Sequence, residues 1–383
     1  MSTPVLLVST ATRWLGTARI PRWLAKAGFE VSLFAPRDTL AEKSPFVSRV
    51  VPLPDNASTL QWVFAFAATV KATSPRIVVP CDDMSFRLLT ALVLTPPEGM
   101  QPALHLQLAA LIRDSLGDPA HFRTSVDKTL LPAAAEALGV RVPPFAVATT
   151  LADAEAFAAL HGYPTVLKRS HGFAGQGVAL CADRAELASA WAEFSRGDPL
   201  ELDGKGGVRL LCQAHIPGRV RLQGIAAWDG EVVAGFAREK LVAHPPPKGP
   251  STVTRYLRAP ELREFSEALV RGFGMKGLFA FEYIVHDATG LAYLIETSRR
   301  ATPGTYTGGL INVDLCAALY GAINGTPSTS RRNLDEGEEH VLAHFPQEWL
   351  RDPGSAYLRE CRVDAPWDEP ELFEAMLALR HER

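Results

Sequence analysis

The sequence lacks the usual marks of disulfide-stabilised, membrane-spanning and nucleic-acid-binding proteins. Cysteine is scarce, and the five residues are widely separated and without the paired spacing of a metal site: Cys81, Cys181, Cys212, Cys316 and Cys361. No apolar run reaches the length of a membrane span, the start has no signal-peptide pattern, and no basic block accompanies the formal net charge of -3. We therefore expect a cytoplasmic protein with reduced cysteines, whose partners are small molecules rather than nucleic acid or a membrane.

Several enzyme motifs are also missing. There is no G-x-S-x-G or H-E-x-x-H motif, and the ten histidines are scattered without ligand spacing. A dinucleotide-binding domain needs three spaced glycines after its first strand, but the run TATRWLG supplies only Gly16. These absences argue against a nucleophile-elbow hydrolase, a zinc site of this type and a dinucleotide-binding domain.

The first part of the chain has the pattern of an α/β domain. A chain of 383 residues, 47% hydrophobic and 21% charged, is long enough for two or three domains. Apolar runs VLLVST, FEVSLFAP and PRIVVPCDD alternate with helical stretches, which predicts a doubly wound parallel sheet up to about residue 112. Ligands of such sheets bind beyond the carboxyl ends of the strands. The polar residues there are either substrate contacts or turn residues and helix caps: Thr10, Thr12, Arg13, Asp82 and Asp83.

The second part carries lysines, glycines and glutamates in a fixed order. Lys128 comes first, and the run VLKRSHGFAGQGV then carries Lys168 and three glycines: Gly172, Gly175 and Gly177. Glu282 and Glu296 follow on two strand-like runs, FAFEYIV and LAYLIET, which predict antiparallel neighbours with both carboxylates on one face. Cations and backbone amides suit phosphate oxygens, and paired carboxylates suit Mg²⁺. The set therefore indicates a nucleotide site, although the glycine run lacks the G-K-[ST] ending of a Walker A motif.

This order of residues resembles the ATP-grasp superfamily between about Arg113 and Gly325. Members bind ATP between two α+β subdomains and mostly join a carboxylate to an amine. The resemblance implies an N-terminal pre-ATP-grasp domain over residues 1–112 and an ATP-grasp domain over 113–383. Within the second, a lid subdomain would span about 141–215 and a C-terminal catalytic subdomain about 216–383.

The resemblance also implies roles for single residues, with ATP and Mg²⁺ as cofactors. The nucleotide would contact Lys128, Lys168, Ser170, Gly172, Gly175, Gly177, Gln213 and Ile216, the last two beside the adenine. Metal ions would be held by Glu282, Glu296 and Ser298. Arg300 would steady the transferred phosphoryl group or the acyl-phosphate, and Lys240 would give a further phosphate contact. Thr305 and Thr307 follow on a loop that would face substrate.

Two departures from the family pattern bear on the site. The usual Glu-x-Asn-Pro-Arg motif reads Glu296 to Arg300 here, with Ser298 in place of asparagine and Arg299 in place of proline. After the IPG turn, many relatives place an acid for the ribose, whereas this chain has Arg219, Val220 and Arg221. The ribose contact and the number of metal ions are therefore open.

The predicted function is an ATP-dependent carboxylate-amine ligase that forms an amide or peptide bond through an acyl-phosphate. Its partners would be a small-molecule carboxylate and an amine, with amino acids among the candidates, and family analogy suggests a homodimer. Three alternatives remain: an ATP-grasp kinase, a carboxylase that uses bicarbonate, and a nucleotide-binding regulatory protein with impaired catalysis.

Overall fold

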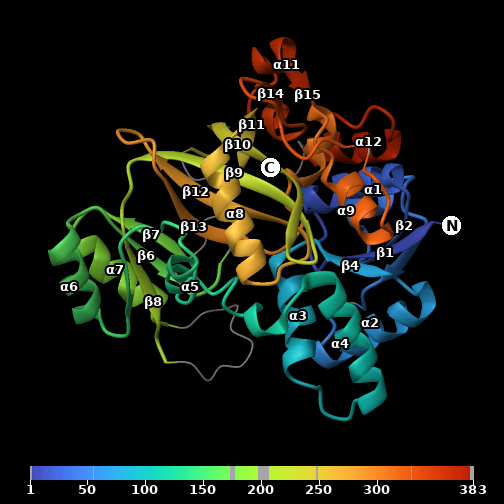
Figure 1. The fold of residues 1–383 in the computed structure, drawn as a ribbon, viewed down its shortest axis with the longest axis horizontal. Helices are drawn as coiled ribbons and strands as arrows, with labels where there is room; N and C mark the ends of the chain where they lie inside the picture. The colour runs from blue at the N-terminus through green and yellow to red at the C-terminus, as the bar shows by residue number, and fades with distance from the viewer. Residues whose placement is uncertain are drawn as a thin grey trace.

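The computed structural model describes residues 2–54, 56–172, 177–196, 207–246, 249–328 and 330–379. In this part of the chain, the strands form one parallel sheet of four, one antiparallel sheet of four and one mixed sheet of seven (Figure 1). The seven-stranded sheet lies between the other two, with the N-terminal sheet on one side and the smaller antiparallel sheet on the other. No helix among the described residues is both long and apolar enough to cross a membrane.

The N-terminal sheet is doubly wound, as predicted. Its strands have the order β3-β2-β1-β4: β1 (Thr3–Val8), β2 (Phe29–Ala35), β3 (Arg49–Pro52) and β4 (Ile77–Pro80). Its helices are α1 (Leu15–Ala27), α2 (Thr59–Thr73), α3 (Asp83–Leu94) and α4 (Pro102–Leu116). Side chains alternate along β1, so that Leu7 packs with α1 on one face and Leu6 packs with α2 to α4 on the other. A strand buried on both faces needs a continuous apolar run, which explains why VLLV is uninterrupted.

The smaller antiparallel sheet contains the predicted hairpin. Its order is β5-β8-β6-β7: β5 (Phe145–Ala148), β6 (Thr165–Arg169), β7 (Val178–Cys181) and β8 (Leu210–Ala214). Helices α6 (Leu151–His161) and α7 (Arg184–Phe194) cover the face that carries Leu167 and Cys212. Lys168 therefore points to the opposite face, and Gln213 shares that face because it pairs with Val166 in the ladder. Gly175 lies outside the described residues.

The seven-stranded sheet forms the centre of the molecule. Its order is β13-β12-β9-β10-β11-β14-β15: β9 (Gly218–Trp228), β10 (Glu231–Ala243), β11 (Ser251–Leu257), β12 (Gly277–His286), β13 (Ala292–Ser298), β14 (His340–Ala343) and β15 (Arg362–Val363). One face packs on α5 (Leu131–Ala137) and α8 (Pro260–Gly272) through residues such as Phe281. The other face packs on α9 (Leu315–Asn324) and the N-terminal sheet through residues such as Phe236. We call this second face, which also carries Glu282, the cleft face.

The last part of the chain returns to the N-terminal part, which the sequence pattern did not predict. Helices α10 (Gln347–Arg351), α11 (Tyr357–Glu360) and α12 (Pro370–Ala378) follow β14. Phe345, Leu372 and Met376 pack with Ala18 of α1 and Leu40 of a short 3-10 helix (Leu40–Lys43). Arg19 donates a hydrogen bond of 2.5 Å to the carbonyl of Asp364. Two further 3-10 helices, Pro119–His121 and Thr305–Ile311, lie in the connections.

Asp82 shows what holds the carboxyl edge of the N-terminal sheet. Its carboxylate caps α3 by accepting from Ser85 N at 2.7 Å. It also accepts from Ser9 Oγ at 2.9 Å, Thr10 N at 2.6 Å and Thr10 Oγ1 at 2.8 Å. These contacts occupy the oxygens of a buried carboxylate, so Asp82 and Thr10 serve the cap and turn rather than the substrate.

Replacing Asp82 by alanine is expected to destabilise the protein more than the same change at Asp183. Asp183 is an exposed cap that accepts from Glu186 N at 2.9 Å, and losing such a cap costs about 1 kcal/mol. At Asp82 several buried donors lose their acceptor, so we expect a loss of about 2–4 kcal/mol. Urea unfolding followed by tryptophan fluorescence measures both variants. Equal unfolding midpoints would contradict the structural role of Asp82.

Candidate active site

Lys128 joins three segments at the edge of the seven-stranded sheet. It lies in the loop before α5, and it is buried. Its backbone N donates to Ser170 O at 2.8 Å, and its Nζ donates to Gly172 O at 2.9 Å. The same Nζ lies 3.2 Å from Glu296 Oε1. One ammonium group therefore contacts both the start of the glycine loop and the carboxylate of β13.

Lys168 approaches the same strand from the end of β6. Its Nζ donates to the carbonyl of Ile295 at 3.4 Å, and its side chain is 6% exposed. Burial lowers the pKa of Lys168 from 10.5 to about 8, and the positive charge of Lys128 adds to this shift. The carboxylates of Glu296 and Glu282 act in the opposite direction. Two buried cations beside two carboxylates form the charged centre of the site.

The two glutamates face each other across the β12–β13 pair, as predicted. Glu282 lies directly opposite Glu296, with a bulge immediately after Glu282, and Ser298 lies opposite Ala280 on the same face. Burial raises the pKa of Glu282, and the neighbouring charge of Glu296 raises it further. Among the described residues, no three His, Cys, Asp or Glu side chains gather into a metal site. A cation held here would need oxygen ligands beyond these two carboxylates, which suits a hard ion that keeps phosphate and water ligands.

Arg238 and Lys240 extend this row of charges across the cleft face. The ladder runs from Glu282 through Leu222 to Arg238, so Arg238 lies on the same face as the glutamates. Lys240 Nζ donates a hydrogen bond to Gly249 O at 3.1 Å. Burial lowers the pKa of Lys240, and the negative charge of Glu282 opposes that shift. Lys240 was predicted to give a phosphate contact, whereas no role was predicted for Arg238. The two-residue period of the strand was the signal that places both on one face.

Arg300 is held by the N-terminal part of the chain. Its Nε donates to Asp83 Oδ2 at 2.8 Å, and its guanidinium lies over the ring of Trp14 at 5.1 Å from the centroid. Asp83, at the start of α3, thus connects the N-terminal sheet with the end of β13. The position predicted for a phosphoryl contact is therefore already neutralised by a carboxylate.

Arg299, which follows Ser298 at the end of β13, is buried. Its Nη2 donates to Leu116 O at 2.6 Å and its Nη1 to Ser125 Oγ at 3.2 Å. Its guanidinium lies near the rings of Phe86 and Phe279, and burial lowers its pKa to about 9. Through these hydrogen bonds, Arg299 connects the end of β13 to the end of α4 and to the loop that contains Ser125.

The two arginines after the IPG turn do not face the cleft. Arg219 and Arg221 pair with Glu239, at 3.1 Å and 2.8 Å, on the opposite face of the sheet. Between them, Val220 is the residue on the cleft face. Gln213 is buried in β8 on the same face as Lys168, and Ile216 lies half-buried in the connection to β9.

Thr305 and Thr307 are buried, which corrects the expectation that they face substrate. Thr307 Oγ1 accepts from Tyr256 OH at 2.8 Å and donates to Gly304 O at 2.6 Å. Thr305 Oγ1 accepts from Thr302 N at 2.8 Å. These contacts fix the loop after Arg300 and occupy both hydroxyls, in part with Tyr256 of β11.

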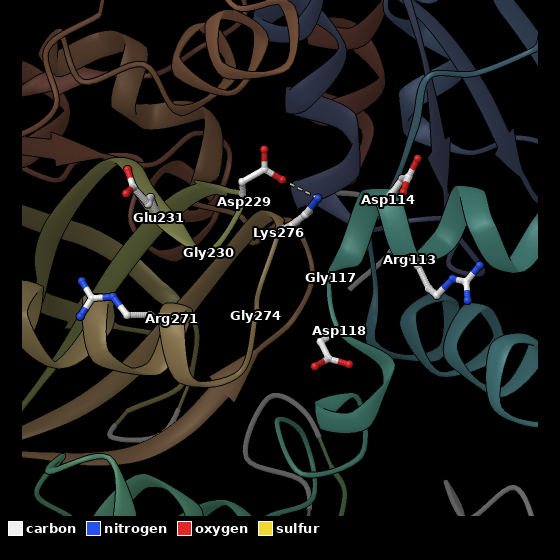
Figure 2. Close-up of a pocket in the computed structure, with 10 residues that line it drawn as sticks. All are labelled: Arg113, Asp114, Gly117, Asp118, Asp229, Gly230, Glu231, Arg271, Gly274 and Lys276. Atoms are coloured by element: carbon white, nitrogen blue, oxygen red, sulfur yellow. Dashed lines mark ion pairs between the residues drawn. The ribbon is translucent and has the colours of Figure 1, made fainter.

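A separate hollow of about 610 Å³ lies at the ends of α4 and α8 (Figure 2). It is lined by Arg113, Asp114, Gly117, Asp118, Asp229, Gly230, Glu231, Arg271, Gly274 and Lys276. Its three basic and four acidic side chains are mixed, and Lys276 pairs with Asp229 at 2.7 Å. None of the residues selected from the sequence lines this hollow. The cleft face, with its lysines and paired glutamates, fits a polyphosphate and a metal ion better than the mixed charges of this hollow do.

A family model and a curated relative each match part of the chain. Residues 127–198 match the family model described as carbamoyl-phosphate synthase L chain, ATP binding domain. The chain is similar to the carbamoyl phosphate synthase large chain of Kocuria rhizophila, with 28% identity over 170 residues. That alignment covers 43% of this chain and 15% of the relative, so the chain spans a small part of the relative's length.

Solved structures resemble a much larger share of the chain. The biotin carboxylase domain of Hydrogenobacter thermophilus 2-oxoglutarate carboxylase, in complex with MgADP, ADP and bicarbonate, matches with a TM-score of 0.64 and 16% identity. The match covers 89% of this chain and 74% of that one. An L-amino acid ligase from Bacillus licheniformis matches with a TM-score of 0.57 and 18% identity, over 84% of this chain and 74% of that one. At these identities the likeness establishes the fold.

The pKa of Lys168 should respond in opposite directions to the loss of its two charged neighbours. Glu296→Gln should lower it below about 8, because the carboxylate favours the charged amine, and Lys128→Met should raise it. The pH dependence of Lys168 acetylation by acetic anhydride, read by mass spectrometry, gives each pKa. Shifts of the same sign in the two variants would contradict the described cluster.

The same pKa has a consequence for stability. Because the folded pKa of about 8 lies below the ordinary value of 10.5, burial of the charged lysine opposes folding below about pH 8. This penalty should disappear as the pH rises from about 8 to 10.5, so Lys168→Met should lose that part of the pH dependence of unfolding.

Proposed function

Because the chain has the ATP-grasp fold, we propose that it is an ATP-dependent enzyme that activates a small carboxylate and joins it to an amine. The expected fold class, a doubly wound N-terminal sheet followed by an ATP-grasp fold, is confirmed. One observation carries the proposed reaction: Glu282 and Glu296 lie side by side, with Lys128 and Lys168 against the same strand. This arrangement offers carboxylates for a metal ion and cations for phosphates in one place.

The residues present fit magnesium and a nucleoside triphosphate. Glu282 and Glu296 would hold Mg²⁺, with Ser298 on the same face as a third, shorter ligand position. When bound, the ion would polarise the phosphoryl oxygens and neutralise charge that builds up on them. Lys128 and Lys168 would bind the phosphates, together with Ser170 and the glycine loop at Gly172, Gly175 and Gly177. Gln213 and Ile216 would lie beside the adenine.

In the first step, an oxygen of the substrate carboxylate forms a bond to the γ-phosphorus of ATP. The bond from that phosphorus to the β,γ-bridging oxygen breaks, and ADP leaves with the electron pair. Charge moves from the γ-phosphoryl group toward ADP, where the two lysines are already in place to stabilise it. Lys240 and Arg300 would contact the phosphoryl group, although Asp83 shares the charge of Arg300.

In the second step, an amine attacks the carbonyl carbon of the acyl-phosphate. A carbon–nitrogen bond forms, the carbon–oxygen bond to phosphate breaks, and the amine loses a proton as inorganic phosphate leaves. The acyl-phosphate would be hydrolysed by bulk water, so a site of this kind has to be enclosed. Burial of Lys128, Lys168 and Arg238 is consistent with an enclosed reaction space.

A carboxylase is the second candidate. The fold is shared with a biotin carboxylase domain solved with MgADP and bicarbonate as well as with an amino acid ligase. Bicarbonate would take the place of the organic carboxylate in the first step, and the same residues would bind it and the nucleotide.

The domain boundary at about residue 112 and a homodimer are also proposals. The solved neighbour with bicarbonate is itself a domain dimer.

Glu296→Gln should abolish turnover, whereas Ser298→Asn should keep it. Loss of the carboxylate removes a ligand with a full charge, for which we expect a fall of about 10²-fold or more, while asparagine restores the common ligand type. The assay is incubation with ATP, Mg²⁺ and pooled carboxylic and amino acids, with hydroxylamine as the amine. ADP and hydroxamates are read by mass spectrometry.

The products separate the candidate reactions. Hydroxamate that disappears in Glu296→Gln supports carboxylate activation and identifies the acid. Release of ADP that depends on bicarbonate, without hydroxamate, would favour the carboxylase. An active Glu296→Gln protein would refute the assignment of Glu296 to the metal.

A further inference from the structure

Arg238 is a buried arginine whose charge is not balanced by a direct contact. Its side chain is 6% exposed, and its guanidinium makes no hydrogen bond or ion pair within the part of the chain that the structure describes. An unpaired buried charge is costly because the charge has lost part of its hydration and no opposite charge replaces it. A guanidinium kept in this state is available to an anion that is not part of the chain.

The other arginines of this region show the contrast. Arg299 donates hydrogen bonds to Leu116 O and Ser125 Oγ, and Arg300 donates one to the carboxylate of Asp83. Arg219 and Arg221 share Glu239 on the far face of the sheet. Arg238, by comparison, lies on the cleft face and acts on Glu282 only through its electrostatic field, which opposes the rise of the Glu282 pKa.

A glycine makes room for this guanidinium. A Cβ added at Gly304 would lie 2.3 Å from Arg238 Cζ and 2.4 Å from its Nη1, so no other residue fits there without displacing the arginine. The backbone of Gly304, with φ of -98°, does not itself require glycine. Thr307 accepts from Tyr256 OH and donates to Gly304 O, which fixes the loop against the guanidinium. The arginine is therefore held in a cradle formed by the loop after Arg300.

The position of Arg238 along the sheet indicates which anion it meets. Lys128 and Lys168 lie at the β13 edge, the two glutamates come next, and Arg238 lies two strands further on from Glu282. If the phosphates lie over the lysines and glutamates, the group that attacks the terminal phosphorus has to come from the other side of that phosphorus. That side is where Arg238 lies.

We propose that Arg238 binds the carboxylate of the acceptor substrate and presents one of its oxygens to the γ-phosphorus. The inference rests on the proposed function and assigns the substrate anion to Arg238 rather than to Arg300. A planar fork of N–H donors matches a carboxylate in two parallel hydrogen bonds. Its charge also reduces the repulsion between the carboxylate and the triphosphate, so the two anions can approach each other.

The test separates binding of the acid from binding of the nucleotide. Arg238→Gln, Arg238→Lys and Gly304→Ala are compared with the wild type, and Arg255→Gln is the matched control. Arg255 lies on β11, faces the opposite side of the sheet and is 38% exposed. Calorimetry measures the Kd of the magnesium complex of a non-hydrolysable ATP analogue, and then the Kd of bicarbonate, acetate and each of the twenty common L-amino acids for that complex. ADP and hydroxamate formation are measured in parallel.

We expect at least one acid to bind the wild-type complex and to bind about 10- to 100-fold more weakly in Arg238→Gln. Arg238→Lys should recover part of that loss because the charge remains but the fork does not. Gly304→Ala should weaken acid binding with Arg238 still present. In all three variants the Kd of the nucleotide analogue should change by less than about 3-fold, and Arg255→Gln should match the wild type.

Several outcomes would overturn this assignment. A loss of nucleotide affinity as large as the loss of acid affinity would make Arg238 a phosphate contact. Unchanged acid binding in Arg238→Gln, or a wild-type complex that binds nucleotide but none of these acids, would remove the basis for a carboxylate site. Acid binding that depends on Arg238 without hydroxamate formation would count against the ligase reaction alone and leave the role of Arg238 supported.

Discussion

The contact between Lys128 and Glu296 is the interaction on which the arrangement of the site depends. It brings together the loop before α5, the glycine loop through Gly172 and the edge strand β13. Neither charge would be favourable in this partly enclosed place without an opposite charge close by. Lys168 lies against the same strand, where the carboxylates of Glu296 and Glu282 offset part of the effect of burial on its charge. The ladder between β12 and β13 thus decides where both lysines are stable.

The segment from Arg299 to Gly304 has a comparable role on the other side of the site. Arg299 enters the protein interior toward α4, and Arg300 turns to Asp83 at the start of α3. The loop that follows is closed by hydroxyl contacts and leaves space for Arg238 beside Gly304. The end of β13 is therefore the junction between the N-terminal sheet and the central sheet.

The sequence predicted those parts of the site that depend on local pattern and order along the chain. Alternation of apolar runs with helical stretches was enough to predict the N-terminal sheet, and the two strand-like runs FAFEYIV and LAYLIET were enough to pair Glu282 with Glu296. The sequence did not predict that Asp83 pairs with Arg300 or that Gly304 leaves space for Arg238, because each residue is distant in the chain from its arginine and has no local pattern that marks it. The burial of Thr305 and Thr307 was missed for the same reason, since a threonine in a loop has no signal that separates a structural hydroxyl from a substrate contact.

The packing of residues 345–379 against α1 has a consequence for the order in which the chain folds during synthesis. N-terminal domains generally fold first as they leave the ribosome. Here Ala18 and Leu40 are covered by Phe345, Leu372 and Met376, which are made much later than the first helix. One side of α1 therefore stays uncovered until residues 345–379 have been made, so the N-terminal part reaches its final packing only after that later segment has left the ribosome.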